Sequence, residues 1–238
     1  MARLASAQGA IRAILITQIA LGFVLIGLDL RNTPAGDAPG MFAPPAQGPS
    51  VRPYRPDMRP GSPGTPAMRP MPDRLAFEIE GENLNITGQI AAGDADRFAA
   101  WLQENRPDIT GISLDSSGGS VSDALAIGRT IRAAGYTTLV SDGAVCMSAC
   151  PYILAAGTER QVTEGGIVGV HQHYFGENTI LPAFMAVKDV QRGQAAVIDY
   201  LTEMGVDLRI MSYALRTPPE EINVLSPDLM AELNLTTV

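Results

Sequence analysis

The chain has 238 residues, of which 46% are hydrophobic, 18% charged and 5% aromatic, and its formal net charge is −8. This composition excludes disorder over the whole length, and the length fits one or two domains. Two cysteines exclude both a framework of several disulfides and a zinc site of four thiolates. The charge is uneven, because residues 1–73 sum to +3 and residues 74–238 to −11. Nucleic-acid binding needs a positive surface, so the acidic second part argues against a nucleic-acid partner.

Residues 1–31 predict a membrane anchor. Arg3 and Arg12 precede an apolar run over residues 13–28, and Asp29 and Arg31 end it. The run is at the short edge of a membrane-spanning helix and somewhat long for the core of a signal peptide. Positive charge on its amino-terminal side predicts that the remainder is translocated out of the cytoplasm, to the periplasmic side. We favour an uncleaved anchor over a cleaved signal, because Thr33-Pro34-Ala35 is a weak cleavage site.

Residues 32–73 predict a proline-rich, disordered linker. Twelve of the eighteen prolines lie here, among Gly, Ala, Ser and Arg. Proline removes a backbone donor and fixes φ, so we expect no helix or sheet to propagate through the segment. The apolar side chains are also too few to offset the entropy of ordering it. Spacing the folded part from the membrane is the expected role, with a proline-rich ligand for a partner domain as the alternative.

Residues 74–238 predict a single α/β domain. Runs of apolar alternation indicate strands, and apolar residues at helical spacing indicate helices between them. Strand alternating with helix implies β-α-β units and a mostly parallel sheet. The expected strands are 75–80, 84–90, 110–114, 137–141, 160–163 and 167–172, and the expected helices are 94–105, 122–134, 147–156, 182–204 and 208–215.

Two turns after predicted strands carry residues that suit catalysis, because sites in α/β folds form at the carboxyl ends of strands. Gly118-Gly119 lets backbone N–H groups point at an anion or a developing oxyanion, although a tight turn explains a glycine pair equally well. Ser148 lies among small side chains at a strand-to-helix turn, where its Oγ is exposed like that of an acyl-transfer nucleophile. The alternative for Ser148 is a helix cap.

The two histidines of the chain, His171 and His173, lie two residues apart at the end of a predicted strand. They therefore face the same side, and a general base at neutral pH is expected to be one of them. One buried, hydrogen-bonded histidine beside an exposed one is the structural alternative. A His-x-His metal site is a weaker hypothesis, because no third ligand such as Glu177 is clearly placed.

Together these segments resemble the Clp-type serine peptidases, whose fold is the crotonase-like β-α-β spiral. Ser116-Ser117-Gly118-Gly119 is similar to the family's Ser-Pro-Gly-Gly, residues 143–148 loosely resemble its Gly-x-Ala-Ala-Ser turn, and His171-Gln172 is similar to its His-Gln. The order is kept, and residues 87–90 resemble the family's opening strand. The likeness covers most of residues 75–238 and is strongest to secreted or membrane-anchored relatives with a Cys-x-Ser-x-Cys turn.

The resemblance implies that Ser148 is the nucleophile and His171 the base, with the N–H groups of Gly119 and Ala149 as the oxyanion hole. It also implies an acid before Leu225-Ser226, for which Glu221 is the best candidate. The sequence departs from the family at three points. Ser117 replaces a proline, Cys146-Met147 replaces two alanines, and counting back from Leu225 gives Ile222, with Glu220 and Glu221 beside it. Glu220 is therefore an alternative to Glu221 as the orienting acid.

A Ser/Lys mechanism is the second hypothesis, because membrane-bound relatives of the signal-peptide-peptidase kind look similar around Lys188. Lysine is the base there and has to be desolvated to lose its proton. We favour Ser/His, because Asp189 and Arg192 make a solvated helix face the simpler explanation for Lys188.

Cys146 and Cys150 are spaced to form a short-loop disulfide around Ser148 in an oxidising compartment. Two buried thiols are the alternative, and Cys146 as the nucleophile is a weaker one.

The sequence thus predicts a membrane-tethered hydrolase, most simply a serine peptidase, that needs no cofactor or metal. Its expected partners are a peptide or protein substrate, the membrane, and further copies of the chain. A catalytically silent scaffold that binds peptide is the alternative from another class. An acyl-thioester enzyme is disfavoured, because such substrates are cytoplasmic.

Overall fold

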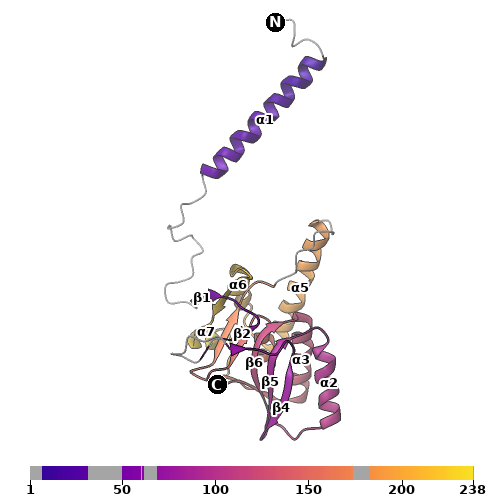
Figure 1. Cartoon of the computed structure of the whole chain (residues 1–238), viewed down its shortest axis with the longest axis vertical. Helices are drawn as coiled ribbons and strands as arrows, with labels where there is room; N and C mark the ends of the chain where they lie inside the picture. Colours follow the sequence, from indigo (N-terminus) through magenta and orange to yellow (C-terminus); the bar gives the residue numbers. More distant parts are fainter. Residues whose placement is uncertain (1–6, 32–49, 60, 62–68, 174–182, 238) are drawn as a thin grey trace. The chain divides into compact units, whose positions relative to one another are not determined.

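The computed structural model describes residues 7–31, 50–59, 61, 69–173 and 183–237. The chain divides into two compact units, Met1–Pro45 and Ala46–Val238. The first contains α1 (Ala7–Arg31), in which residues Gln8–Ile26 are long and apolar enough to cross a membrane and are not buried against protein. The second is a mixed α/β unit, shown with its labelled elements in Figure 1.

The described residues of the second unit form a nine-stranded sheet in the order β1-β11-β10-β8-β6-β5-β4, with β7 and β9 continuing beside β6. The inner pairs β5–β6, β6–β7, β6–β8, β8–β10 and β7–β9 are parallel, whereas the edge pairs β4–β5, β10–β11 and β1–β11 are antiparallel. The strands are β1 (Ser50–Pro53), β4 (Ala76–Glu80), β5 (Asn83–Ile90), β6 (Gly111–Gly119), β7 (Thr137–Val140), β8 (Val145–Met147), β9 (Arg160–Val162), β10 (Ile167–Val170) and β11 (Glu221–Val224). A separate pair consists of β2 (Met58–Arg59) and β3 (Arg69–Pro70).

β6 joins two parts of the sheet. Its first residues, Gly111–Ser113, pair with β7, and Ser116 further along pairs with Cys146 of β8. The strand therefore turns from one set of neighbours to another just before its two terminal glycines. This places the carboxyl end of β6 directly beside the carboxyl end of β8.

Helices cover the strands with apolar side chains. α2 (Asp94–Asn105) and α3 (Val121–Ala134) lie side by side against β4, β5 and β6 (Figure 1), and α3 also contacts α4 (Cys150–Ala155). The remaining helices are α5 (Ala183–Met204), α6 (Arg209–Arg216) and α7 (Pro227–Glu232). Fully buried residues from strands and helices form one core, among them Leu84, Ile86, Phe98, Ile112, Leu114, Ile127, Ile131, Ile153, Leu154 and Tyr200. Burial of this apolar surface is the main stabilising contribution to the unit.

Asp94, a buried carboxylate, ties β4 to α2. It accepts hydrogen bonds from the backbone N–H groups of Leu75 (3.1 Å) and Ala91 (2.8 Å), and it pairs with Arg97 at 2.6 Å and Arg74 at 2.9 Å. Burial alone raises the pKa of Asp94, but the hydrogen bonds and the two guanidinium groups outweigh it, so the pKa lies below its ordinary value. The charge is therefore retained in the interior.

The structure differs from the sequence prediction in the linker. Residues 32–73 were expected to form no sheet, yet Ser50–Pro53 pairs residue by residue with Val224–Glu221, and the folded unit extends well ahead of residue 74. The prediction was wrong for these residues because β1 is the outermost strand of the sheet, and a proline is tolerated on an edge strand. The short strands β8 and β11 and the helix α7 were also not predicted.

Candidate active site

Ser148 lies on a tight turn between β8 and α4. Its φ is 60°, a left-handed conformation that a non-glycine residue adopts only when its surroundings hold it there. The turn is held by a hydrogen bond from the Ser148 N–H to the Gly169 carbonyl (2.9 Å) and by a disulfide between Cys146 and Cys150. Both cysteines are fully buried, so the disulfide lies on the side of the turn that faces the protein interior. The disulfide also removes Cys146 as a nucleophile.

His171 reaches Ser148 because β10 pairs in parallel with β8, with Gly169 opposite Met147. The chain then continues past the end of β10 to a buried imidazole, 5% exposed, whose Nε2 lies 2.7 Å from Ser148 Oγ. Gln172 holds this position, because its N–H donates to the Thr217 carbonyl and its Nε2 donates to the Leu215 carbonyl. The arrangement is that of a hydroxyl nucleophile with an adjacent base.

The environment of His171 favours the neutral imidazole. Burial lowers its pKa below the ordinary value, and the backbone carbonyls of Pro218 and Pro219 and the charge of Glu220 offset this only in part. The other ring nitrogen, Nδ1, is buried and makes no hydrogen bond of good geometry within the described residues. A neutral ring at neutral pH can accept a proton at Nε2.

Neither acid expected from the sequence bonds to His171 within the described residues. The side chain of Glu221 is exposed, and its backbone pairs with Pro53 in the β1–β11 ladder. Glu220 is also exposed, but it lines the same cavity as His171 and acts on its pKa through space. Of the two acids, only Glu220 therefore influences the pKa of His171 in the structure. The role of Glu221 as the residue that orients His171 stays a prediction.

The two glycines at the end of β6 let the backbone approach the nucleophile turn. Gly118 has φ 90°, and a Cβ on it would overlap the Met147 carbonyl oxygen and Ser148 Cβ. Its N–H is bonded to Ser116 Oγ at 3.1 Å, whereas Gly119 lines the cavity with Ser148. Within the described residues, the N–H of Ala149 has no acceptor, although this residue is fully buried. This arrangement suits an oxyanion hole.

A cavity of about 900 Å³ opens beside Ser148 and His171. Its walls are formed by the start of α3, by small side chains of α5 and by the loop before β11. The lining includes Gly119, Ser120, Val121, Leu125, Gly193, Ala196, Pro219 and Glu220. A largely apolar cleft with a few polar groups gathered at one point is typical of a substrate site.

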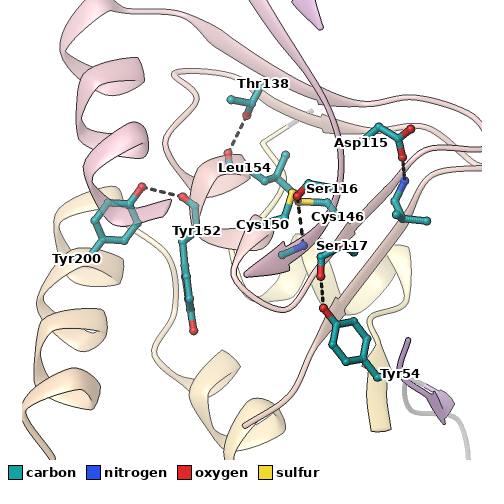
Figure 2. The surroundings of a disulfide bond; sticks show 12 residues. Tyr54, Asp115, Ser116, Ser117, Thr138, Cys146, Cys150, Tyr152, Leu154 and Tyr200 are labelled. Carbon is teal, nitrogen blue, oxygen red and sulfur yellow. Dashed lines mark hydrogen bonds between the residues drawn. A yellow bond between two sulfur atoms is a disulfide. The ribbon is translucent and has the colours of Figure 1, made fainter. Parts of the chain in front are cut away.

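Tyr54, which sequence reasoning missed, also lies at the site. Its ring centroid is 4.5 Å from that of His171, and its hydroxyl donates to the Ser117 carbonyl beside the disulfide, as Figure 2 shows for Tyr54, Ser117 and the two cysteines. Burial raises the pKa of Tyr54 to about 12, and a hydrogen bond with Ser148 opposes this rise. The one available signal was a lone tyrosine in the proline-rich segment, and no local pattern connects it with residues almost a hundred positions away.

The remaining candidates lie apart from the nucleophile. Lys188 is exposed on α5 and does not line the cavity. His173 lines the cavity, and its Nε2 lies 2.8 Å from the Tyr152 hydroxyl. The described residues contain no group of three His, Cys, Asp or Glu side chains that could hold a metal ion. Glu177 lies outside the described residues.

Comparison with known proteins identifies a distant structural neighbour and no family. No family model matches the chain, and no curated protein is similar to it. Among solved structures, a mutant of the 1510-N membrane-bound stomatin-specific protease is similar with a TM-score of 0.47 and 17% sequence identity, over 66% of this chain and 76% of that chain. A likeness of this degree decides neither the details of the fold nor the activity.

Proposed function

We propose that the protein is a membrane-tethered serine hydrolase, most simply a peptidase, with Ser148 as nucleophile and His171 as base. The observation that carries the proposal is the 2.7 Å contact between Ser148 Oγ and His171 Nε2 at a turn in left-handed conformation. A serine that serves only as a helix cap needs neither this strain nor a buried imidazole beside it.

The geometry supports a two-step acyl transfer. Ser148 Oγ attacks the substrate carbonyl carbon while its proton moves to His171 Nε2, and the carbonyl oxygen becomes an oxyanion facing the N–H groups of Gly119 and Ala149. The leaving amine then takes the proton from His171 as the scissile bond breaks, which leaves an ester on Ser148. In the second step His171 takes a proton from water as the water oxygen attacks the ester carbon. The bond between that carbon and Ser148 Oγ then breaks, the carboxylic acid leaves, and Ser148 Oγ takes back the proton from His171.

The same proposal includes the crotonase-like spiral of the Clp-type peptidases as the fold, with the folded unit outside the cytoplasm. Arg3 and Arg12 ahead of the apolar run over residues 13–28 support this orientation, and so does a disulfide in a chain whose two cysteines are both paired. A peptide substrate is supported by an open cleft that leads to the nucleophile with a mainly apolar lining.

An activity-based probe tests the function directly. We expect an alkyl fluorophosphonate to label the full-length protein in detergent, and we expect Ser148→Ala and His171→Ala to abolish the label. Lys188→Ala is the matched control for the base, because this side chain is exposed and lies away from the cavity. Loss of label in Lys188→Ala with retention in His171→Ala would identify the lysine as the base.

One observation favours a second function. The buried Nδ1 of His171 has no hydrogen-bonded carboxylate within the described residues, and a base without an orienting acid loses most of its rate. A peptide-binding scaffold with a silent site fits this feature. Absence of label from a folded protein with its disulfide intact would favour the scaffold over the hydrolase.

A further inference from the structure

The residues that precede the predicted domain contribute to the candidate site. β1 pairs with β11 over four residues, and the Tyr54 N–H then donates to the Glu220 carbonyl at 2.7 Å. Further along, an ion pair between Arg59 and Asp115 of β6 holds the segment, and a hydrogen bond from the Met71 N–H to the Asp57 carbonyl (3.1 Å) closes the segment on itself. The segment is thus attached to β11, to the residue before it, and to β6 at Asp115.

Tyr54 is the residue through which this segment reaches the nucleophile. Its hydroxyl donates to the carbonyl of Ser117, the residue before the glycine pair, and its ring packs on the imidazole of His171. It also packs with a small apolar cluster that includes Met71 and Met147, and Met147 directly precedes Ser148. One side chain therefore contacts the glycine turn, the base and the strand that ends at the nucleophile.

Tyr54 forms a wall of the site and leaves the cavity open. Tyr54 and Pro56 line the cavity together with Ser148 and His171, and the cavity keeps a volume of about 900 Å³ beside the nucleophile with the tyrosine in place. A side chain that plugged the site would leave no such space next to Ser148.

We infer that Tyr54, which directly follows β1, is a positioning residue for His171 and restrains an imidazole that no described carboxylate orients. The inference rests on the proposed function. Packing against an aromatic ring limits rotation of the imidazole, and small losses of alignment between base and nucleophile cost large factors in rate. The ring also shields the imidazole from water, which favours its neutral form.

The other groups facing His171 set the background for any pH measurement. Glu220 from the loop before β11 favours the protonated ring, as do the carbonyls of Pro218 and Pro219. His173 lies on the same loop as His171, and the charge of His171 lowers the pKa of His173. None of these groups is altered when Tyr54 is substituted, so a change in the His171 titration reports on the tyrosine.

The experiment measures the second-order rate of fluorophosphonate labelling against pH for the full-length protein in detergent. We expect Tyr54→Ala to label about 10- to 100-fold more slowly than the wild type. Its pH midpoint should move upward, toward about 6.5, as water reaches the imidazole. Tyr54→Phe keeps the ring and should keep the wild-type midpoint, with a smaller loss of rate because the hydroxyl that bonds with Ser117 and Ser148 is missing. Arg55→Ala is the matched control, because Arg55 directly follows Tyr54 and its side chain is exposed.

Three results would overturn the inference. Wild-type labelling in Tyr54→Ala would make the tyrosine a bystander, faster labelling would make it an inhibitory plug, and slower labelling at an unchanged midpoint would reduce it to general packing. The Cys146–Cys150 disulfide and the thermal midpoint verify that each variant is folded. If the wild type takes no label, the proposed function fails, and an NMR titration of His171 still tests the tyrosine by whether Tyr54→Ala raises its pKa.

Discussion

Opening the Cys146–Cys150 disulfide should destabilise the protein by a small, calculable amount. The two cysteines are four positions apart, and constraint of the unfolded chain by so short a loop contributes about 2 kcal/mol. For a folded unit of this size, that free energy corresponds to a thermal midpoint lower by about 4–8 °C. The loss is modest, because the rest of the turn is held by strand pairing and by the hydrogen bond from Ser148 to Gly169.

Thermal unfolding of the full-length protein in detergent, with and without a reductant, measures this contribution. Reduction keeps both side chains and changes only the bond between their sulfur atoms, which then separate to van der Waals distance, so it tests the cross-link without removing side-chain atoms. The double variant Cys146→Ala/Cys150→Ala loses sulfur volume as well, and it should unfold at a still lower temperature and be insensitive to the reductant. The reasoning fails if the reductant shifts the wild type no more than it shifts the double variant.

Three further outcomes are expected. Fluorophosphonate labelling should fall on acidification with a midpoint below the usual histidine value of about 6.5 and stay level through neutral pH, because burial lowers the pKa of His171, which accepts a proton only when neutral. Asp94→Asn should lower the free energy of unfolding at pH 7 by about 2–3 kcal/mol in urea denaturation, with exposed Asp96→Asn near wild type. The folded-state pKa of Asp94 is depressed, so the charged carboxylate stabilises the wild type fully above about pH 4. This stabilisation is lost as the pH falls through the folded-state pKa, and the stabilities of the wild type and Asp94→Asn should then converge. Deletion of residues 1–31 should move the protein from the membrane fraction to the soluble fraction after sedimentation, whereas a protein that remains with the membrane would show that α1 is not its anchor.

Local sequence patterns predicted much of the α/β unit. The helix expected at 94–105 is α2 with the same bounds, and the strand expected at 84–90 is β5 with one residue added. β8 was missed because three residues, Val145–Met147, are too few to show a period. β1 was missed because prolines dominate its surroundings, and its pairing with β11 depends on contacts far apart in the chain.

For the candidate site, sequence analysis predicted the residue types better than their partners. Ser148 and His171 were both expected at turns after strands, but β8, the strand that ends at Ser148, was not predicted, so the pairing of the two residues came from the resemblance to the Clp-type peptidases. The environment of His171 depends on Tyr54 and on the loop before β11, which lie far away on either side of it in the sequence. No periodicity or motif encodes such contacts. Counting back from Leu225 likewise could not tell whether Glu220 or Glu221 faces the cavity.

The place of β1 at the margin of the sheet determines where a recombinant fragment should begin. A fragment starting at residue 74 would lack β1, the outer partner of β11, so the backbone amides and carbonyls on that side of β11 would be left without acceptors and donors. It would also uncover Ile222 and Val145, which now pack with Met71 and Tyr54. An exposed edge strand of this kind pairs with strands of other chains, so such a fragment would be prone to aggregation during purification. Soluble material therefore requires a start before Ser50.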